Sequence, residues 1–235
     1  MTATLYGLGV GPGDPELITV KALNILRRVP VIVYPAAIDV PSFARQIVEP
    51  YLDGKQREIV FAMPMTPSQF PANAVYDKVE RQIRQTLSSG QDVAVLCEGD
   101  PFFYGSFAYL YGRMANDVRV QVVPGVSSLM TCATYAGMPL AARNDTLVIL
   151  PAPLRNDVLK QGLENHDAAA IIKVGRHLGR IRSIVQDMGL VDCAFYIERA
   201  SLPEQKVMPL SAYHKEQAPY FSMILTHKRG KAYVI

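Results

Sequence analysis

The stretch TLYGLGVGPGDPELIT, residues 4–19, decides the fold. Its first part, Thr4–Val10, is short and apolar and is typical of a buried β-strand, and it leads through glycines to a helix start. Asp14 is a favourable N-cap, Pro15 suits the first helical turn, and Glu16 favours the positive end of the helix dipole. The stretch therefore predicts a strand, a glycine-rich loop and a helix, which is the opening unit of an α/β fold.

Strand-like and helix-like runs alternate through the rest of the sequence, as in α/β proteins. The first helix is expected to continue through apolar residues at helical spacing, namely Ile18, Ala22, Ile25 and Val29. Further strands are expected at Val31–Tyr34 (ended by Pro35), 93–97, 118–123, 146–150, 169–174, 194–198 and 220–226. Further helices are expected at 73–88, 127–136, 156–164 and 178–189. We expect two domains, residues 1–123 and 124–235.

The composition is that of a globular protein. Of the 235 residues, 19% are charged and 49% are hydrophobic, and the net charge is +3 with no block of like charges, so nothing favours disorder or a nucleic-acid partner. No apolar run approaches the ~20 residues that cross a bilayer, and residues 1–11 lack the basic start of a secretory signal. The three cysteines and four histidines show no metal-ligand spacing. We therefore expect a cytoplasmic protein with no bound metal and no membrane partner.

The loop Gly7–Asp14 invites comparison with the dinucleotide-binding pattern G-x-G-x-x-G. The match fails, because counting from Gly7 places Pro12 at the sixth position and counting from Gly9 places Asp14 there. Neither residue suits close backbone approach to a pyrophosphate, so a nicotinamide cofactor is not expected. A purely structural explanation is a tight strand-to-helix turn stiffened by proline, although such turns also form the walls of ligand sites.

Two more polar turns each follow a predicted strand: EGDPFFYG at 98–105 and PGVSS at 124–128. Ligands of open α/β sheets bind beyond the carboxyl ends of strands. There, Gly99 allows close approach to the backbone, and Asp100 can bind an amino group or ribose hydroxyls. Taken singly, the first turn is also explained as a polar turn with Pro101 as a breaker, and the second as a serine cap of a helix.

Taken together and in this order, the three motifs resemble those of the tetrapyrrole methyltransferases, the S-adenosylmethionine enzymes that methylate uroporphyrinogen and precorrins. The family patterns G-x-G-P-G-D-x-x-L-[LI]-T, G-D-P-x-x-[YF]-G and P-G-[VI]-[ST]-[SA] correspond to Gly9–Thr19, Gly99–Gly105 and Pro124–Ser128. The resemblance covers essentially the whole chain. It implies two α/β domains of the tetrapyrrole methylase type, with S-adenosylmethionine in the interdomain cleft, and a homodimer.

Five stretches are most similar to the members of this family that methylate precorrin-2 at C-20: residues 97–107, 140–145, 172–177, 196–201 and 219–225. The resemblance therefore implies C-methylation of precorrin-2 at its C-20 meso carbon, giving precorrin-3A in cobalamin biosynthesis. Residues 140–145 and 147–153 favour the metal-free substrate over cobalt-precorrin-2. Uroporphyrinogen-III C-methylation and methylation of protein or RNA also stay open within the family, and a non-catalytic tetrapyrrole carrier stays open outside the enzymes.

The resemblance also implies roles for individual residues. The expected cofactor contacts are Pro12, Glu98, Gly99, Asp100, Phe103, Ser127, Ser128, Val174, Ala200 and Ser222. Glu98 departs from the glycine that many relatives have, so a more open loop is not implied. Lys173, Asp100 and Tyr104 are expected near the reacting centre. Lys173 interrupts an apolar strand and can pair with Asp100 across the cleft or simply point to solvent.

A substrate with eight carboxylates is expected to be held by basic side chains. The candidates are Arg143, Arg176, His177, Arg180 and Arg199. For each of them, an ordinary solvated surface charge is an alternative at least as good as a role in substrate binding. The sulfonium methyl group is already activated, so the protein is expected to orient it and to need no covalent nucleophile. A side chain or water then removes the proton left on the methylated carbon.

Overall fold

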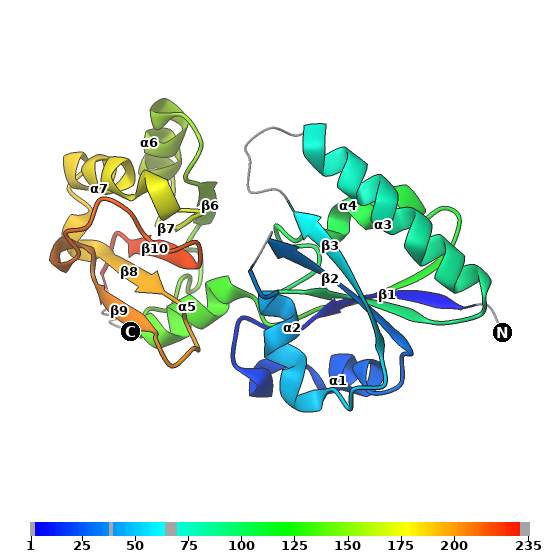
Figure 1. The fold of residues 1–235 in the computed structure, drawn as a ribbon. Helices are drawn as coiled ribbons and strands as arrows, with labels where there is room; N and C mark the ends of the chain where they lie inside the picture. The colour runs from blue at the N-terminus through cyan, green and yellow to red at the C-terminus, as the bar shows by residue number, and fades with distance from the viewer. Residues whose placement is uncertain (1–2, 38–39, 64–69, 231–235) are drawn as a thin grey trace. The chain divides into compact units, whose positions relative to one another are not determined.

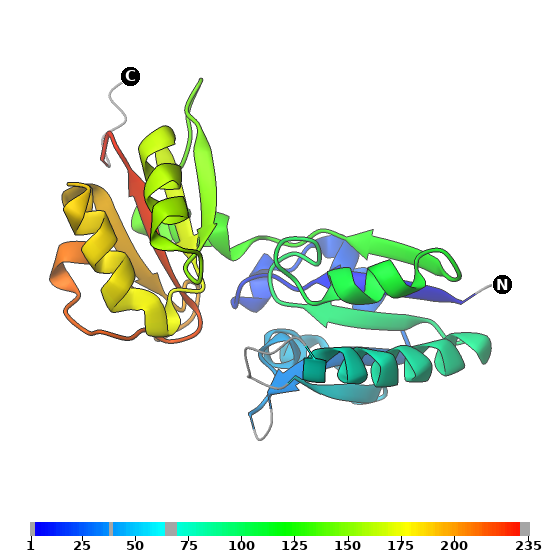
Figure 2. The ribbon, with the colours of Figure 1, turned by 90° about the horizontal axis from the view of Figure 1, so that it is seen from above.

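The computed structural model describes residues 3–37, 40–63 and 70–230, and the chain divides into two compact units. Unit 1 is Met1–Ser127 and unit 2 is Ser128–Ile235. Each unit contains one five-stranded sheet with helices packed on it (Figures 1 and 2). The predicted fold class is therefore confirmed. The expected domain division before Pro124 stays a prediction.

Unit 1 contains a parallel sheet in the order β3-β2-β4-β1-β5. Its strands are β1 (Thr4–Gly9), β2 (Val31–Ala37), β3 (Arg57–Met63), β4 (Val93–Cys97) and β5 (Arg119–Val123). The central strands β1 and β4 are buried throughout, as expected for parallel strands covered on both faces. Because all five strands run in one direction, the turns that follow them lie along the same edge of the sheet.

Four helices cover the two faces of this sheet (Figure 1). On one face, α1 (Val20–Leu26) and α2 (Phe43–Val48) pack on alternate strand residues such as Leu8. On the other face, α3 (Phe70–Ser88) and α4 (Phe107–Met114) pack on the intervening residues, Val95 among them. Side chains of a strand alternate between the two faces, so a continuous apolar strand supplies both cores.

Unit 2 contains a mixed sheet in the order β6-β7-β10-β8-β9. Its strands are β6 (Leu147–Pro151), β7 (Ala168–Ile172), β8 (Ala194–Glu198), β9 (Lys206–Pro209) and β10 (Ser222–His227). Strand β10 is antiparallel to both β7 and β8, and it starts beside the ends of those two strands: Met223 pairs with Ile172 and Ser222 with Glu198. The turns after β7 and β8 and the start of β10 therefore share one edge of this sheet.

Three helices complete unit 2. The helices α6 (Asn156–Asn165) and α7 (Leu178–Asp187) pack on one face of the sheet, where Leu159 and Ile181 join the core. The helix α5 (Ser128–Ala136) contacts β8, β9 and β10 on the opposite face (Figure 1). Among the described helices of both units, none combines the length and apolar character that a bilayer span requires.

Two predicted features of the first elements are wrong. The continuous helix after Asp14 is divided: Pro15–Leu17 forms a separate 3-10 turn, and Thr19 begins α1 by accepting a hydrogen bond from the Ala22 N–H at 3.2 Å. Nor does Pro35 end the second strand. Beyond Val33, β2 pairs only with β3, so a residue without an N–H is tolerated on the open side.

The remaining predicted strands and helices are confirmed with their ends shifted by up to three residues. The stripe Ile18, Ala22, Ile25 and Val29 is buried as predicted. Among the described α-helices and β-strands, four were not predicted: α2, β3, α4 and β9. Lys173, expected inside a strand, lies in the turn that follows β7.

Candidate functional site

Glycine turns meet at the carboxyl edge of the unit 1 sheet, after the adjacent strands β4, β1 and β5. The N–H of Gly99 donates to the carbonyl of Gly11 at 2.7 Å, joining the turns after β4 and β1. A Cβ atom on Gly9 would lie 2.5 Å from the nitrogen of Gly125, and one on Gly125 would lie 2.0 Å from the carbonyl oxygen of Gly99. Only glycine fits this backbone packing. We call Gly9, Gly11, Gly99 and Gly125 the glycine junction.

The Asp100 carboxylate holds the junction together. Its Oδ2 accepts the N–H of Gly125 at 3.0 Å, and its Oδ1 accepts the N–H of Phe102 at 2.9 Å. Asp100 therefore fixes its own turn and also the turn after β5. Each carboxylate oxygen has a further lone pair, so the group can still accept a hydrogen bond from a ligand hydroxyl or ammonium group.

The other predicted unit 1 residues surround this junction. Pro12 is buried in the turn after β1, and Glu98 directly precedes Gly99. Burial raises the pKa of the Glu98 carboxyl, and hydrogen bonds from backbone N–H groups, that of Ala44 among them, offset only part of the rise. Phe103 packs edge-to-face on Tyr104, with ring centroids 5.1 Å apart, and Tyr104 is more than half exposed.

The serine pair lies where unit 1 ends and unit 2 begins. Ser127 is half-buried and Ser128 is exposed, and Ser128 is the first residue of α5. The predicted helix start is therefore confirmed, and the serines stand three residues or fewer from Gly125.

A second set of predicted residues gathers at one edge of the unit 2 sheet. Val174 and Ala200 are buried just beyond β7 and β8, and Ser222 is buried at the start of β10, where its hydroxyl donates to the Pro219 carbonyl at 2.7 Å. Lys173 and Arg199 are exposed at the same edge. We call Lys173, Val174, Arg199, Ala200 and Ser222 the β7–β8 edge.

Backbone strain marks several of the candidates. Within the described residues, the left-handed region is occupied by five residues other than glycine: Tyr104, Arg143, Lys173, Arg199 and Ser201, with φ values of 55°, 53°, 57°, 52° and 72°. The first four were all selected from the sequence as site residues. Such conformations cost of order 1–3 kcal/mol each and persist where surrounding structure enforces them, often at ligand sites.

The basic candidates of unit 2 differ in what they contact. The Arg180 guanidinium donates to the carbonyls of Ala152 and Leu154 and to the Asn156 side chain, so it holds the loop before α6. Partial burial lowers the pKa of His177, and the guanidinium groups of Arg180 and Arg176 lower it further. His177 is therefore less charged at neutral pH than an ordinary histidine, and Arg180 is largely engaged. Arg176 and Arg199 are exposed at or near the β7–β8 edge.

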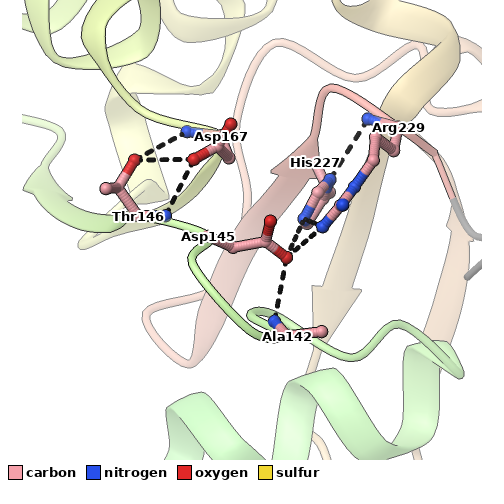
Figure 3. Close-up of polar contacts among 6 residues, drawn as sticks. All are labelled: Ala142, Asp145, Thr146, Asp167, His227 and Arg229. Atoms are coloured by element: carbon pink, nitrogen blue, oxygen red, sulfur yellow. Dashed lines mark hydrogen bonds and ion pairs between the residues drawn. The ribbon is translucent and has the colours of Figure 1, made fainter.

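Arg143 lies at the opposite end of the unit 2 sheet from the β7–β8 edge. It is two residues before Asp145, whose carboxylate accepts hydrogen bonds from the Ala142 N–H at 2.8 Å, from buried His227 and from Arg229 (Figure 3). His227 pairs with Ala168 at the start of β7, whereas Lys173 follows the end of that strand. Five strand residues, about 16 Å, separate the two ends. No pattern in the sequence indicated this separation.

Sequence reasoning also missed the contact roles of Gly9 and Gly125 and the ion pair of the buried Glu198 carboxylate with the half-exposed Lys206. The glycines stood inside the recognised motifs, but their mutual contact joins residues more than a hundred positions apart. Among the described residues, no three His, Cys, Asp or Glu side chains are close enough to hold a metal ion together.

The two sheets and the turns at their edges define an α/β protein whose polar and glycine-rich residues gather beyond the strand ends. The model of the tetrapyrrole (corrin/porphyrin) methylases matches residues 4–214. The chain belongs to this family.

Curated relatives agree with this assignment. The chain is 36% identical over 229 residues to the precorrin-2 C(20)-methyltransferase of a Sinorhizobium species, covering 94% of both chains. It is 32% identical to the cobalt-precorrin-2 C(20)-methyltransferase of Salmonella typhimurium, covering 97% of this chain and 98% of that one. It is 37% identical to the cobalamin biosynthesis protein CobIJ of Mycobacterium bovis, of whose length it spans only 45%.

Solved structures show the same fold. The uroporphyrin-III C-methyltransferase of Thermus thermophilus, in complex with S-adenosylhomocysteine, superimposes with a TM-score of 0.69 at 21% sequence identity. The matched region covers 95% of this chain and 97% of that one. At this identity the similarity extends to the fold alone.

Proposed function

We propose that this protein transfers a methyl group from S-adenosylmethionine to the C-20 meso carbon of precorrin-2, giving precorrin-3A and S-adenosylhomocysteine. The observation that carries the proposal is the 36% identity to the Sinorhizobium precorrin-2 C(20)-methyltransferase, which extends over 94% of both chains. The intact glycine junction supports it, because Gly9, Gly11, Gly99 and Gly125 all lie in the segments that match the family motifs.

The chemistry of the junction fits the cofactor. Asp100 keeps acceptor capacity for an ammonium group or ribose hydroxyls, and the Glu98 carboxyl beside it adds another acceptor. Pro12, Gly99, Phe103, Ser127 and Ser128 would supply the remaining unit 1 contacts. In unit 2, Val174 and Ala200 would give backbone or apolar contacts and Ser222 a further one.

S-adenosylmethionine supplies, when bound, a methyl group activated by the adjacent sulfonium. The electron-rich meso carbon forms the new C–C bond as the S–CH₃ bond breaks, and the proton on C-20 leaves to a base. The task of the protein is to hold the two reacting carbons about 3–3.5 Å apart and in line. Lys173, Asp100 and Tyr104 are the residues proposed near the reacting centre, and Lys173 and Tyr104 both have strained backbones.

The eight carboxylates of the substrate call for cations. Arg176 and Arg199 are the best placed of the candidates, because both are exposed at or near the β7–β8 edge. Arg143 would serve only a substrate group that reaches the far end of the unit 2 sheet. Arg180 and His177 would act mainly by shaping the loop and helix turn beside Arg176.

Cobalt-precorrin-2 is the alternative substrate, supported by the 32% identity to the Salmonella enzyme over nearly the full length of both chains. Uroporphyrinogen III is a further candidate substrate within the family. We also propose that the protein is a homodimer and acts in the cytoplasm, where its free cysteines Cys97, Cys132 and Cys193 would remain reduced.

The test is to incubate the purified protein anaerobically with precorrin-2 and S-adenosylmethionine carrying a ¹³C-methyl group, and to locate the label by NMR. Label on C-20 is expected. A parallel reaction with cobalt-precorrin-2 decides whether the metal-free ring is preferred. Label on a pyrrole carbon, or no transfer while S-adenosylhomocysteine still binds, would contradict the proposed substrate, and the second result would favour a tetrapyrrole carrier.

A further inference from the structure

The turn between β8 and β9 is unusually constrained. It begins with Arg199, Ala200 and Ser201, of which Arg199 and Ser201 have φ values of 52° and 72°. Hydrogen bonds fix its course: the Arg199 N–H donates to the Phe221 carbonyl at 2.8 Å, and the Ser201 N–H donates to the Gln205 side chain at 2.8 Å. Two left-handed residues in one short turn require a support strong enough to hold them there.

An ion pair joins the two strands at the base of this turn. Glu198 is the last residue of β8, Lys206 is the first of β9, and the two stand opposite one another in the antiparallel register. The Lys206 ammonium contacts Oε1 of Glu198 at 2.6 Å. Residues 199–205 therefore form a loop whose two ends are joined by the backbone pairing of β8 with β9 and, at its base, by this charged side-chain contact.

The other carboxylate oxygen of Glu198 is also engaged. The Tyr196 hydroxyl, two residues earlier on the same face of β8, donates to Oε2. The Tyr196 ring stacks on Tyr213 with centroids 3.8 Å apart, and both rings are buried. The Glu198 carboxylate is thus held by Tyr196 of β8 and by Lys206 of β9. Tyr213, in the segment after β9, packs on Tyr196 and so supports this arrangement.

The Glu198 carboxylate is buried, although burying a charged group is energetically unfavourable. The Glu198 side chain is only 3% exposed, and removing a charge from water is costly unless its partners are well placed. Burial alone would raise the pKa of Glu198, yet hydrogen bonds from Lys206 and Tyr196 lower it below its ordinary value, so the group is held as an anion. An apolar pair would stabilise the hairpin as well, but without directional bonds that fix where the turn points.

We infer that Glu198, clamped by Lys206, is a positioning residue that presents the Arg199–Ser201 turn to S-adenosylmethionine. The inference rests on the proposed function, because it takes Ala200 as a cofactor contact. Glu198 itself does not touch the cofactor. It acts by holding the strained backbone of the turn in the one arrangement that binds.

The unit 2 sheet provides a matched control at its other end. Asp145 is a carboxylate only 9% exposed that pairs with Arg229, which is 54% exposed; Glu198 is 3% exposed and pairs with Lys206, which is 53% exposed. The two ion pairs are alike in burial, but only the Glu198 pair adjoins the β7–β8 edge. Removing Arg229 therefore reproduces the loss of an ion pair without disturbing the Arg199–Ser201 turn (Figure 3).

The experiment measures S-adenosylhomocysteine affinity by calorimetry, with the folded fraction checked by circular dichroism and urea unfolding. The variants are Glu198→Gln, Lys206→Met, the double variant, Lys206→Arg and the control Arg229→Met. Each of the first two should weaken binding about tenfold, the low end of the effect of removing a group that orients a binding residue. The double variant should bind S-adenosylhomocysteine no more weakly than either single variant. Lys206→Arg, which keeps the positive charge, should retain most of the wild-type affinity.

The outcomes separate the two proposals. If the wild-type protein does not bind S-adenosylhomocysteine, the proposed function fails. If the wild type binds and folded Lys206→Met binds equally well, the positioning role of Glu198 is wrong. An equal loss of affinity in Arg229→Met would also overturn it, because the effect would then follow from general destabilisation of unit 2. If Glu198→Gln does not fold, the comparison of Lys206→Met with Lys206→Arg tests the positioning role instead, and equal affinity of the two variants would contradict it.

Discussion

The carboxylate of Asp100 accepts the backbone N–H of Gly125 at 3.0 Å and so ties the turn after β4 to the turn after β5. The two turns flank the one that follows β1, since β1 lies between β4 and β5 in the sheet. The Asp100 side chain therefore joins two of the three family motifs, and the backbone bond from the Gly99 N–H to the Gly11 carbonyl joins the third. Asp100, selected from the sequence as a ligand residue, is equally a structural one.

Replacing Asp100 with alanine should damage both binding and stability. Two backbone N–H groups, those of Phe102 and Gly125, lose their acceptor. The exposed Phe102 N–H can bind water instead, whereas the part-buried Gly125 N–H is left unsatisfied, at a cost of about 1–3 kcal/mol. We expect a lower free energy of unfolding in urea and at least a tenfold weaker affinity for S-adenosylhomocysteine. Asp100→Asn retains one acceptor oxygen and should fall between. An alanine variant with wild-type affinity would remove Asp100 from the binding site.

Replacing Gly125 with alanine should be more damaging than the size of a methyl group suggests. The new Cβ would lie 2.0 Å from the Gly99 carbonyl oxygen, so two backbone turns must move apart. We expect a loss of several kcal/mol in unfolding free energy, as for overpacked sites. Gly112→Ala is the control: it lies in α4 with open space around its Cβ position and should stabilise by about 0.5–1 kcal/mol. Equal effects of the two changes would contradict the junction as described.

The sequence predicted those elements whose pattern is local. Val93–Cys97 is a continuous apolar run and Ala194–Glu198 is apolar up to its last residue; neither is an edge strand, and their predicted bounds match the structure. The edge strands β3 and β9 were missed, whereas the edge strands β5 and β6 were predicted. Strand β9 has only four residues, and β3 begins with the charged pair Arg57 and Glu58, although its apolar run at residues 59–63 is itself a strand signal. The short helices α2 and α4 span only two turns, too few for periodicity to stand out.

The candidate site was predictable to a similar degree. The motif residues around Gly99 were found because family patterns are contiguous in sequence. The pairing of Glu198 with Lys206 depends on the register of a hairpin whose second strand was not predicted. The distance of Arg143 from the β7–β8 edge depends on the parallel pairing of β6 with β7, which places the segment before β6 and the turn after β7 at opposite ends of the sheet; no local pattern specifies which strands pair.

Replacing Lys173 should lower turnover without lowering the stability of the protein. It is exposed, its φ is 57°, and glycine adopts this conformation without strain. Lys173→Gly should therefore leave the free energy of unfolding unchanged or raise it by up to about 1 kcal/mol, while lowering turnover. Lys173→Ala should lower turnover without relieving the strain. Unchanged kinetics in both variants would exclude Lys173 from the mechanism.

The Asp145 cluster should make stability depend on pH in a defined direction. The Ala142 N–H, followed by His227 and Arg229, holds the pKa of the Asp145 carboxyl below its ordinary value, against the opposing effect of burial. A carboxyl whose pKa is lower in the folded state contributes stability above its unfolded pKa of about 4, and that contribution is lost as pH falls through the folded pKa. Asp145→Asn should therefore be less stable than wild type at pH 7, and the difference should shrink as the pH falls below about 4.

The measurement is urea unfolding of both proteins between about pH 3 and 7, a range that spans the ordinary carboxyl pKa of about 4. The control is Asp192→Asn, at an exposed position, whose stability should follow that of the wild type. A difference that stayed constant down to the lowest pH would mean that the loss comes from packing and not from the carboxylate charge.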